Sequence, residues 1–159
     1  DENRAVSDPN NAGSFIASQE EDTHGFELSI AGSPYPGFEL SAGYSYVDTD
    51  LETDPTPAHS GVIWGRYTFL DGALENLYIG AGVQAVGEFE AVSNGVKIDA
   101  PGYTVVNAAA GYRINENCEV GLFVKNLLDH EYVERVNTTE RGVFYGEPLT
   151  ATLRLTGRF

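Results

Sequence analysis

Apolar and polar residues alternate along the last eleven positions of the chain, from Leu149 to Phe159. One side of this segment carries leucine, alanine, glycine and the terminal phenylalanine, whereas the other carries threonine and two arginines, Arg154 and Arg158. A period of two over this length is typical of a β-strand with one apolar and one polar face. Such a strand could close a transmembrane β-barrel or a soluble β-sandwich, and the other segments have to distinguish these two fold classes.

Six earlier segments show the same alternation, and no segment reads as a helix of useful length. We expect strands at 24–33, 38–47, 59–69, 77–90, 103–114 and 118–132, followed by the closing strand at 149–159. The predicted class is therefore all-β, with consecutive strands antiparallel in an up-and-down order.

The connections between these strands alternate in length. The short connections lie near Pro34, Asp71 and Asn115, and the long ones follow Val47, Glu90 and Tyr132. Every second connection of an up-and-down sheet lies at the same end, so all short turns share one end and all long loops share the other. Outer-membrane barrels sort their connections in this way, whereas Greek-key sandwiches have no reason to do so.

Aromatic residues occur at both ends of the apolar faces. Near the short turns they are Phe38, Phe69, Tyr112 and Phe159, and near the long loops they are Tyr44, Tyr46, Phe89 and Tyr132. At a rise of ~3.3 Å per residue and a tilt of ~40°, the segment from Phe38 to Tyr46 spans about 20 Å, close to the ~25 Å apolar band of a barrel. The pattern predicts a lipid-facing band between two aromatic girdles.

The chain has a formal net charge of −15, which argues against a nucleic-acid partner, because phosphates require a basic surface. Acidic residues occupy every second position of the predicted loop 48–54. Oxygen ligands suit Ca²⁺, but the glycine and the bidentate glutamate of a calcium loop are missing, so a solvated loop is the favoured interpretation. No other spacing indicates a metal, a cofactor or a catalytic group, and we predict that the protein is not an enzyme.

The number of predicted strands bears on the extent of the chain. Seven is odd, whereas bacterial single-chain barrels have even strand numbers. Residues 1–23 hold few apolar residues, and we interpret them as an outer-loop remnant that leads into the barrel strands at 24–159. The favoured interpretation is part of a larger barrel. The alternative is a small complete eight-stranded barrel with a structural or adhesive role.

Two motifs resemble the end of TonB-dependent outer-membrane receptors. The segment Asn126–Tyr132 resembles their Asn-Leu-Phe-Asp-x-x-Tyr signature, and the segment Tyr145–Phe159 resembles their closing strand. The hairpin from Gly25 to Tyr46 is similar to a repeated hairpin of the ferric-siderophore branch. Two positions depart from the family pattern, Leu128 in place of phenylalanine and Gly157 in place of a larger residue.

This resemblance implies a barrel of about 22 strands that encloses a plug domain, with the last seven strands supplied by this chain. It implies import of a ferric siderophore across the outer membrane, with TonB acting through a plug segment that is absent here. It also implies contact with outer-membrane lipid and with the barrel-assembly machinery. The assembly signal would be formed by Leu153, Leu155 and the terminal Phe159.

Four residues are candidates for contact with the plug or the solute. Trp64 and Arg66 share the predicted lumen face, where we expect them to pack against the plug and pair with its acids; a place on the solute path is the alternative. Phe144 and Tyr145 close the last long loop. They would either stack on a siderophore chelate or belong to the outer aromatic girdle.

Overall fold

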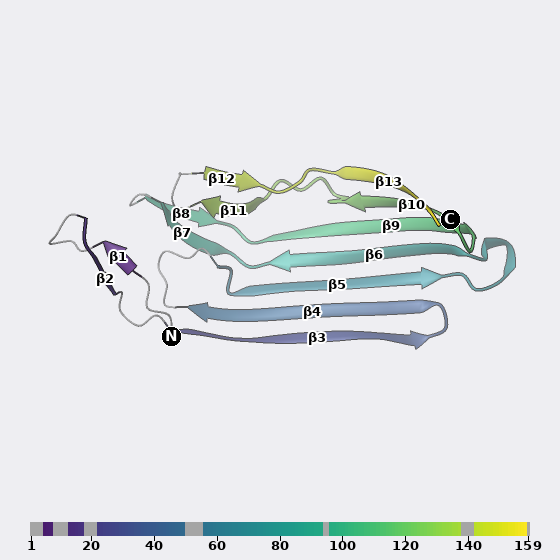
Figure 1. Ribbon diagram of the computed structural model, residues 1–159, viewed down its shortest axis with the longest axis horizontal. Coiled ribbons are helices and arrows are strands. Elements are labelled where there is room, and N and C mark those ends of the chain that lie inside the picture. The colour runs from purple at the N-terminus through teal and green to yellow at the C-terminus, as the bar shows by residue number, and fades with distance from the viewer. Residues whose placement is uncertain are drawn as a thin grey trace.

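The computed structural model describes residues 5–7, 13–17, 22–49, 56–93, 96–137 and 142–158. Within these residues, seven antiparallel strands form one open sheet in the order β13-β10-β9-β6-β5-β4-β3, seen in Figure 1. The strands are β3 (Thr23–Tyr35), β4 (Phe38–Thr49), β5 (His59–Thr68), β6 (Leu77–Val86), β9 (Tyr103–Asn115), β10 (Cys118–Lys125) and β13 (Thr150–Gly157). The predicted all-β, antiparallel order of seven strands is confirmed.

Six shorter strands pair as three separate hairpins. They are β1 (Ala5–Ser7) with β2 (Phe15–Ala17), β7 (Phe89–Ser93) with β8 (Val96–Ala100), and β11 (Val133–Asn137) with β12 (Gly142–Tyr145). A single turn of 3-10 helix covers Gly72–Leu74. No helix in the described part of the chain is long and apolar enough to cross a membrane.

Two predicted strands end earlier than expected. The segment 77–90 leaves the sheet after Val86, and the segment 118–132 leaves it after Lys125. The second departure has a local cause, because Asn126 and Asp129 adopt φ angles of 48° and 50°, which no extended strand contains. The expected loops are also more regular than predicted, since they contain the β7–β8 and β11–β12 hairpins.

The connections are sorted by length, as predicted. In Figure 1 the tight turns lie at the right end of the sheet, and the β7–β8 and β11–β12 hairpins lie beyond its left end. Gly37 has a φ of 81° in the β3–β4 turn, and its carbonyl oxygen accepts a 2.7 Å hydrogen bond from the Thr68 amide. In the β9–β10 turn, the Asn115 carboxamide oxygen accepts a 2.9 Å bond from the Asn117 amide.

The strand register gathers the predicted apolar residues on one face of the sheet. Ile63 pairs with Val83, Val83 pairs with Val106, and Leu122 pairs with Leu153. This face is bare in the isolated chain; Leu153, for example, is 74% exposed. A sandwich would cover such a face with a second sheet. The described residues form a single layer, so the sandwich hypothesis is wrong.

The opposite face carries polar groups and two large aromatic side chains that lie over glycines. The indole of Trp64 lies where a side chain on Gly80 or Gly82 would have to go, and the phenol ring of Tyr78 occupies the same space above Gly111 and Gly121. Glycine in a strand interior often marks such a close approach. With glycines on one side of its ring and the Arg66 guanidinium on the other, Tyr78 is only 5% exposed although the sheet is one layer thick.

Two of the predicted girdle aromatics are elsewhere. Phe89 is 6% exposed in a small core between the β7–β8 and β11–β12 hairpins. Tyr132 stacks on Tyr103, with ring centroids 4.1 Å apart. Tyr103 pairs with Val86 on the polar face, so Tyr132 also lies on that side. Both predictions were wrong because these residues follow the points at which the chain leaves the sheet, where strand parity no longer applies.

The remaining predicted aromatics at the long-loop end do lie on the apolar face. The rings of Tyr44 and Tyr46 both contact Phe26 of β3, with centroids 5.7 and 5.8 Å away. The Tyr44 hydroxyl also shares a 2.7 Å hydrogen bond with Nδ1 of His59. This group has the amphipathic chemistry of a membrane–water interface.

Candidate functional site

The turn that follows β10 is built around the buried side chain of Asn126. Asn126 is 2% exposed and has a positive φ, which asparagine tolerates better than most residues. Its Nδ2 donates hydrogen bonds to the carbonyl oxygens of His130 (2.8 Å) and Glu147 (3.0 Å), and its Oδ1 accepts one from the His130 amide (2.9 Å). One side chain therefore closes its own turn and binds the segment that leads into β13.

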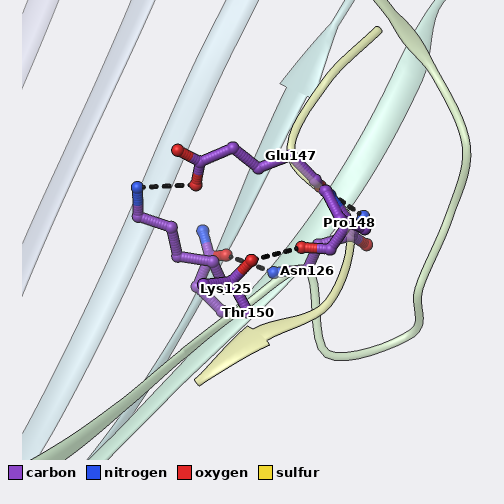
Figure 2. A network of polar contacts seen from close by, with 6 residues as sticks. Lys125, Asn126, Glu147, Pro148 and Thr150 are labelled. Carbon is purple, nitrogen blue, oxygen red and sulfur yellow. Dashed lines mark hydrogen bonds and ion pairs between the residues drawn. The ribbon is translucent and has the colours of Figure 1, made fainter. Parts of the chain in front are cut away.

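Further polar contacts fix this segment from both sides. Asp129 Oδ1 accepts a 2.8 Å hydrogen bond from the Leu149 amide. Lys125 Nζ lies 2.9 Å from Glu147 Oε2, and the Thr150 hydroxyl donates a 2.9 Å hydrogen bond to the Pro148 carbonyl oxygen. Both contacts are drawn in Figure 2. We call the contacts of Asn126, Asp129 and Lys125 with residues 147–150 the β13 clamp.

The β13 clamp is also anchored to the neighbouring strand. The Asn126 amide donates to Oδ1 of Asn107 on β9 at 2.9 Å, and the Leu127 amide donates to the Val106 carbonyl oxygen at 2.7 Å. The register between β10 and β13 begins at the clamp, with Lys125 opposite Thr150. Because a slip of one residue would move every apolar side chain of β13 to the polar face, a fixed entry point protects the alternation of this strand.

Trp64 and Arg66 lie on the polar face, as the sequence predicts. The Arg66 guanidinium is 4.0 Å from the centroid of the Tyr78 ring, and its Nε is 4.0 Å from Oε2 of Glu39. This buried Nε has no hydrogen-bond partner among the described residues. A buried N–H that lacks an acceptor is costly, which makes Arg66 a candidate for a further polar contact.

Tyr78 is a central residue of the polar face that sequence reasoning missed. It alternates with Leu77 and Ile79 and therefore looks like any outward-facing strand residue. Its burial depends on the glycines at 111 and 121, which the register places beside it on β9 and β10. Only the strand order brings these positions together, and the sequence signal is limited to an unusual number of glycines.

Phe144 and Tyr145 lie on β12, outside the seven-stranded sheet. Their side chains are 43% and 71% exposed, and the Arg135 guanidinium lies 4.5 Å from the Phe144 ring centroid. On the β7–β8 hairpin, Lys97 Nζ forms ion pairs with Glu90 Oε1 at 2.6 Å and with Asp99 Oδ1 at 3.8 Å. The hydrogen bond with Glu90 raises the pKa of Lys97 above its ordinary value, with attraction to both carboxylates adding to the effect.

The remaining candidates are placed only in part. Leu153 and Leu155 are each 74% exposed on the apolar face of β13, whereas the terminal Phe159 lies outside the described residues. Residues 50–54 of the acidic loop also lie outside them. In the portions that the structure does describe, no three His, Cys, Asp or Glu side chains gather in a group able to hold a metal ion.

Comparison with protein families gives a match over most of the chain. The family described as TonB dependent receptor-like, beta-barrel matches residues 2–127. This range includes Lys125 and Asn126 of the β13 clamp but not Asp129 or residues 147–150.

Relatives and solved structures agree with the family match. The chain is 32% identical over 164 residues to the metal-pseudopaline receptor CntO of Pseudomonas aeruginosa, covering 97% of this chain and 23% of the relative. It is 36% identical over 138 residues to the ferric-pyoverdine M114 receptor PbuA of Pseudomonas sp., covering 78% and 17%. The open form of the ferric-catecholate import receptor Fiu from Escherichia coli K12 superposes with a TM-score of 0.73 at 30% identity, covering 87% and 21%. The chain thus spans less than a quarter of these receptors.

Proposed function

Because this chain belongs to the family of TonB-dependent receptor-like β-barrels, we propose that it is the C-terminal part of an outer-membrane receptor that imports ferric siderophores. The family is one of receptors and transporters, and enzymatic activity is no part of the proposal. The observation that carries it is the exposed apolar face of the sheet, together with relatives named as a metal-pseudopaline receptor, a ferric-pyoverdine receptor and a catecholate siderophore receptor. The iron is cargo in this function, not a resident cofactor.

In this proposal the chain supplies part of the barrel wall. The apolar face meets outer-membrane lipid, and the polar face meets the lumen. The edge strands β3 and β13 each leave one row of backbone N–H and C=O groups unpaired within the sheet. Such groups require partners inside a membrane, so further strands of a barrel of about 22 would have to close the wall. Residues 1–23 would be the remnant of an outer loop.

The polar face supports contact with a plug. Arg66 contributes a buried Nε that has no acceptor among the described residues, and Trp64 lies beside it over the glycines of β6. A plug carboxylate or carbonyl would satisfy this donor, and TonB would act through a plug segment. Phe144 and Tyr145, exposed on the outer hairpin, would stack on the chelate as it enters.

The closing strand supports a role in assembly. Leu153 and Leu155 project from the apolar face of β13, which is an edge strand of the described sheet. Strand edges are templates for pairing with another chain. The barrel-assembly machinery would recognise this strand together with Phe159.

The test is uptake of ⁵⁵Fe by iron-restricted cells from which the full-length receptor gene has been deleted. We expect uptake of one chelate in a panel of hydroxamate, catecholate and mixed siderophores to fall to background and to return when the gene is restored. Disruption of the gene for TonB should abolish uptake but leave surface binding intact.

Two other outcomes would contradict parts of the proposal. If iron uptake is unchanged while uptake of another scarce solute, such as cobalamin, is lost, the siderophore assignment is wrong and the receptor assignment stands. If solute passes without TonB, the receptor assignment is wrong as well.

A further inference from the structure

Two outer hairpins from different connections share one hydrophobic core. The β7–β8 hairpin lies between β6 and β9, and the β11–β12 hairpin lies between β10 and β13. Their common core consists of Phe89 (6% exposed), Ala91 (0%), Ala100 (2%) and Val136 (3%), with Ile98 and Val133 packed against it. We call these residues the outer core.

The outer core joins the hairpins rather than stabilising each one separately. Phe89 pairs with Ala100 and Ala91 pairs with Ile98, so these four residues lie on one face of the β7–β8 hairpin. A two-stranded hairpin cannot bury an alanine completely by itself, because one of its faces is always open. The complete burial of Ala91 therefore requires a covering segment, and Val136 of β11 is part of it.

The opposite face of the β7–β8 hairpin remains open to solvent. Val92 is adjacent to Ala91 in the chain and is 38% exposed. Two neighbouring residues of similar chemistry thus have opposite environments. This contrast shows that the covering contact is specific to one face, as packing between two elements requires.

The base of the β11–β12 hairpin is also attached to the sheet. The Tyr132 ring stacks on Tyr103, the first residue of β9, at a centroid distance of 4.1 Å. The Tyr132 carbonyl oxygen accepts a 2.9 Å hydrogen bond from the Gly146 amide, which lies just after β12. The β13 clamp continues this attachment through Glu147. Opening of this hairpin would have to break contacts at both its base and its side.

We infer that the β7–β8 and β11–β12 hairpins form one rigid body, in which the residues of the outer core are positioning residues for Phe144 and Tyr145. Arg135 lies next to Val136 on β11 and holds the Phe144 ring on the other side of the hairpin from the outer core. Tyr145 follows Phe144 on the opposite face and pairs with Val133, which packs against the outer core. Each exposed aromatic is therefore held by one face of the same body. If the proposed function holds, a movement that closes over an incoming solute would come from other loops. This inference does not depend on which solute the receptor carries.

Hydrogen exchange in the full-length receptor in detergent micelles tests the inference without a ligand. The variant Ala91→Asp places a charge in the outer core. We expect exchange to become about tenfold faster in 89–100 and also in 133–137, because local opening of one hairpin exposes the other. The second segment is the informative one, since Ala91 is not part of it.

Val92→Asp is the matched control. It places the same charge one residue away on the open face of the same strand. We expect exchange in 133–137 to remain as in the unmodified receptor. If Ala91→Asp accelerates exchange in 89–100 alone, the hairpins move independently and the inference is wrong. Equal acceleration of 133–137 by both variants would also overturn it, because the effect would then not pass through the outer core.

A reciprocal and milder pair covers the case in which Ala91→Asp prevents assembly. Val136→Ala removes two methyl groups from the outer core on the β11 side, whereas Val136→Ile keeps the core filled. We expect Val136→Ala to accelerate exchange in 89–100 several-fold and Val136→Ile to leave it near the original rate. Unchanged exchange in 89–100 for Val136→Ala would contradict a shared rigid body.

Discussion

Asn126 shows how much one side chain can organise where a regular strand ends. Its amide group uses both hydrogens and its oxygen in three hydrogen bonds, while its backbone turns the chain out of β10. Aspartate has nearly the same shape but cannot donate from Oδ2 when ionised, and alanine can make none of these bonds. The need for two donor hydrogens and one acceptor oxygen explains the asparagine at this position.

We predict that Asn126→Ala destabilises the assembled receptor by about 1–3 kcal/mol, because two carbonyl oxygens and one amide lose a partly buried hydrogen bond. Asn126→Asp should also be destabilising, since it removes the donors. Urea unfolding of the receptor in detergent measures the effect. Asn117→Ala, at an exposed turn position, is the control and should stay within about 0.5 kcal/mol. An Asn126→Ala variant as stable as this control would show that the β13 clamp does not depend on the side chain.

A second residue-scale prediction concerns the glycine beneath Tyr78. A methyl group on Gly111 would overlap the Tyr78 ring, whereas one on Gly32 would meet no atom within 4 Å. We expect Gly111→Ala to cost about 1–3 kcal/mol through displacement of the ring. Gly32→Ala should be neutral or slightly stabilising. Unfolding midpoints compare the two, and equal midpoints would mean that Tyr78 moves aside without cost.

At the scale of elements, the seven-stranded sheet is amphipathic but incomplete. Its apolar face exposes large side chains such as Leu28, Ile63 and Leu155, and both of its outer strands have an unpaired edge. In water, an exposed apolar face and an open edge both favour association with other chains. The sheet therefore depends on surroundings that the isolated chain does not provide.

We predict that residues 24–159 expressed alone do not form a soluble monomer. The expected result in detergent-free buffer is aggregate in the void volume of a gel-filtration column, since neither the apolar face nor the edges are covered. Addition of detergent should reduce aggregation by covering the face, although the edges remain open. A soluble monomer with a cooperative unfolding transition would contradict the prediction.

At the scale of the whole molecule, the polar face, the outer hairpins and the β13 clamp belong to a larger barrel. The relatives that the chain matches are more than four times its length. The alternative, a complete eight-stranded barrel, requires an eighth strand, but the described sheet contains seven.

If the proposed function holds, Phe144→Ala and Tyr145→Ala should each raise the Kd for the transported ferric siderophore up to about tenfold, because stacking on an aromatic ring contributes about 0.5–1.5 kcal/mol. Quenching of intrinsic fluorescence in the purified receptor measures Kd. Tyr35→Ala provides a control, since Tyr35 is 54% exposed but lies at the short-turn end of β3. Unchanged affinity in both variants would favour other loops as the binding surface.

Local alternation was sufficient to predict the strands, their faces and the sorting of the connections. The side chains of Leu153, Arg154 and Leu155 project to alternate faces whatever the strand pairs with, because the pleat has a period of two. Trp64 and Arg66 were placed on the polar face by the same rule. The family resemblance in 126–132 was also recognisable from the sequence. The hydrogen bonds by which Asn126 holds this turn and the segment before β13 were not.

Only the tertiary structure decided what happens where the chain leaves the sheet. Phe89 and Tyr132 fit the alternation, yet Phe89 is buried by Val136 and Tyr132 is held by Tyr103. Likewise, the burial of Tyr78 depends on glycines that strand order brings beneath it. A pattern of period two records on which side of its own strand a residue lies. It holds no information about which distant segment covers that side, because packing is set by register and strand order.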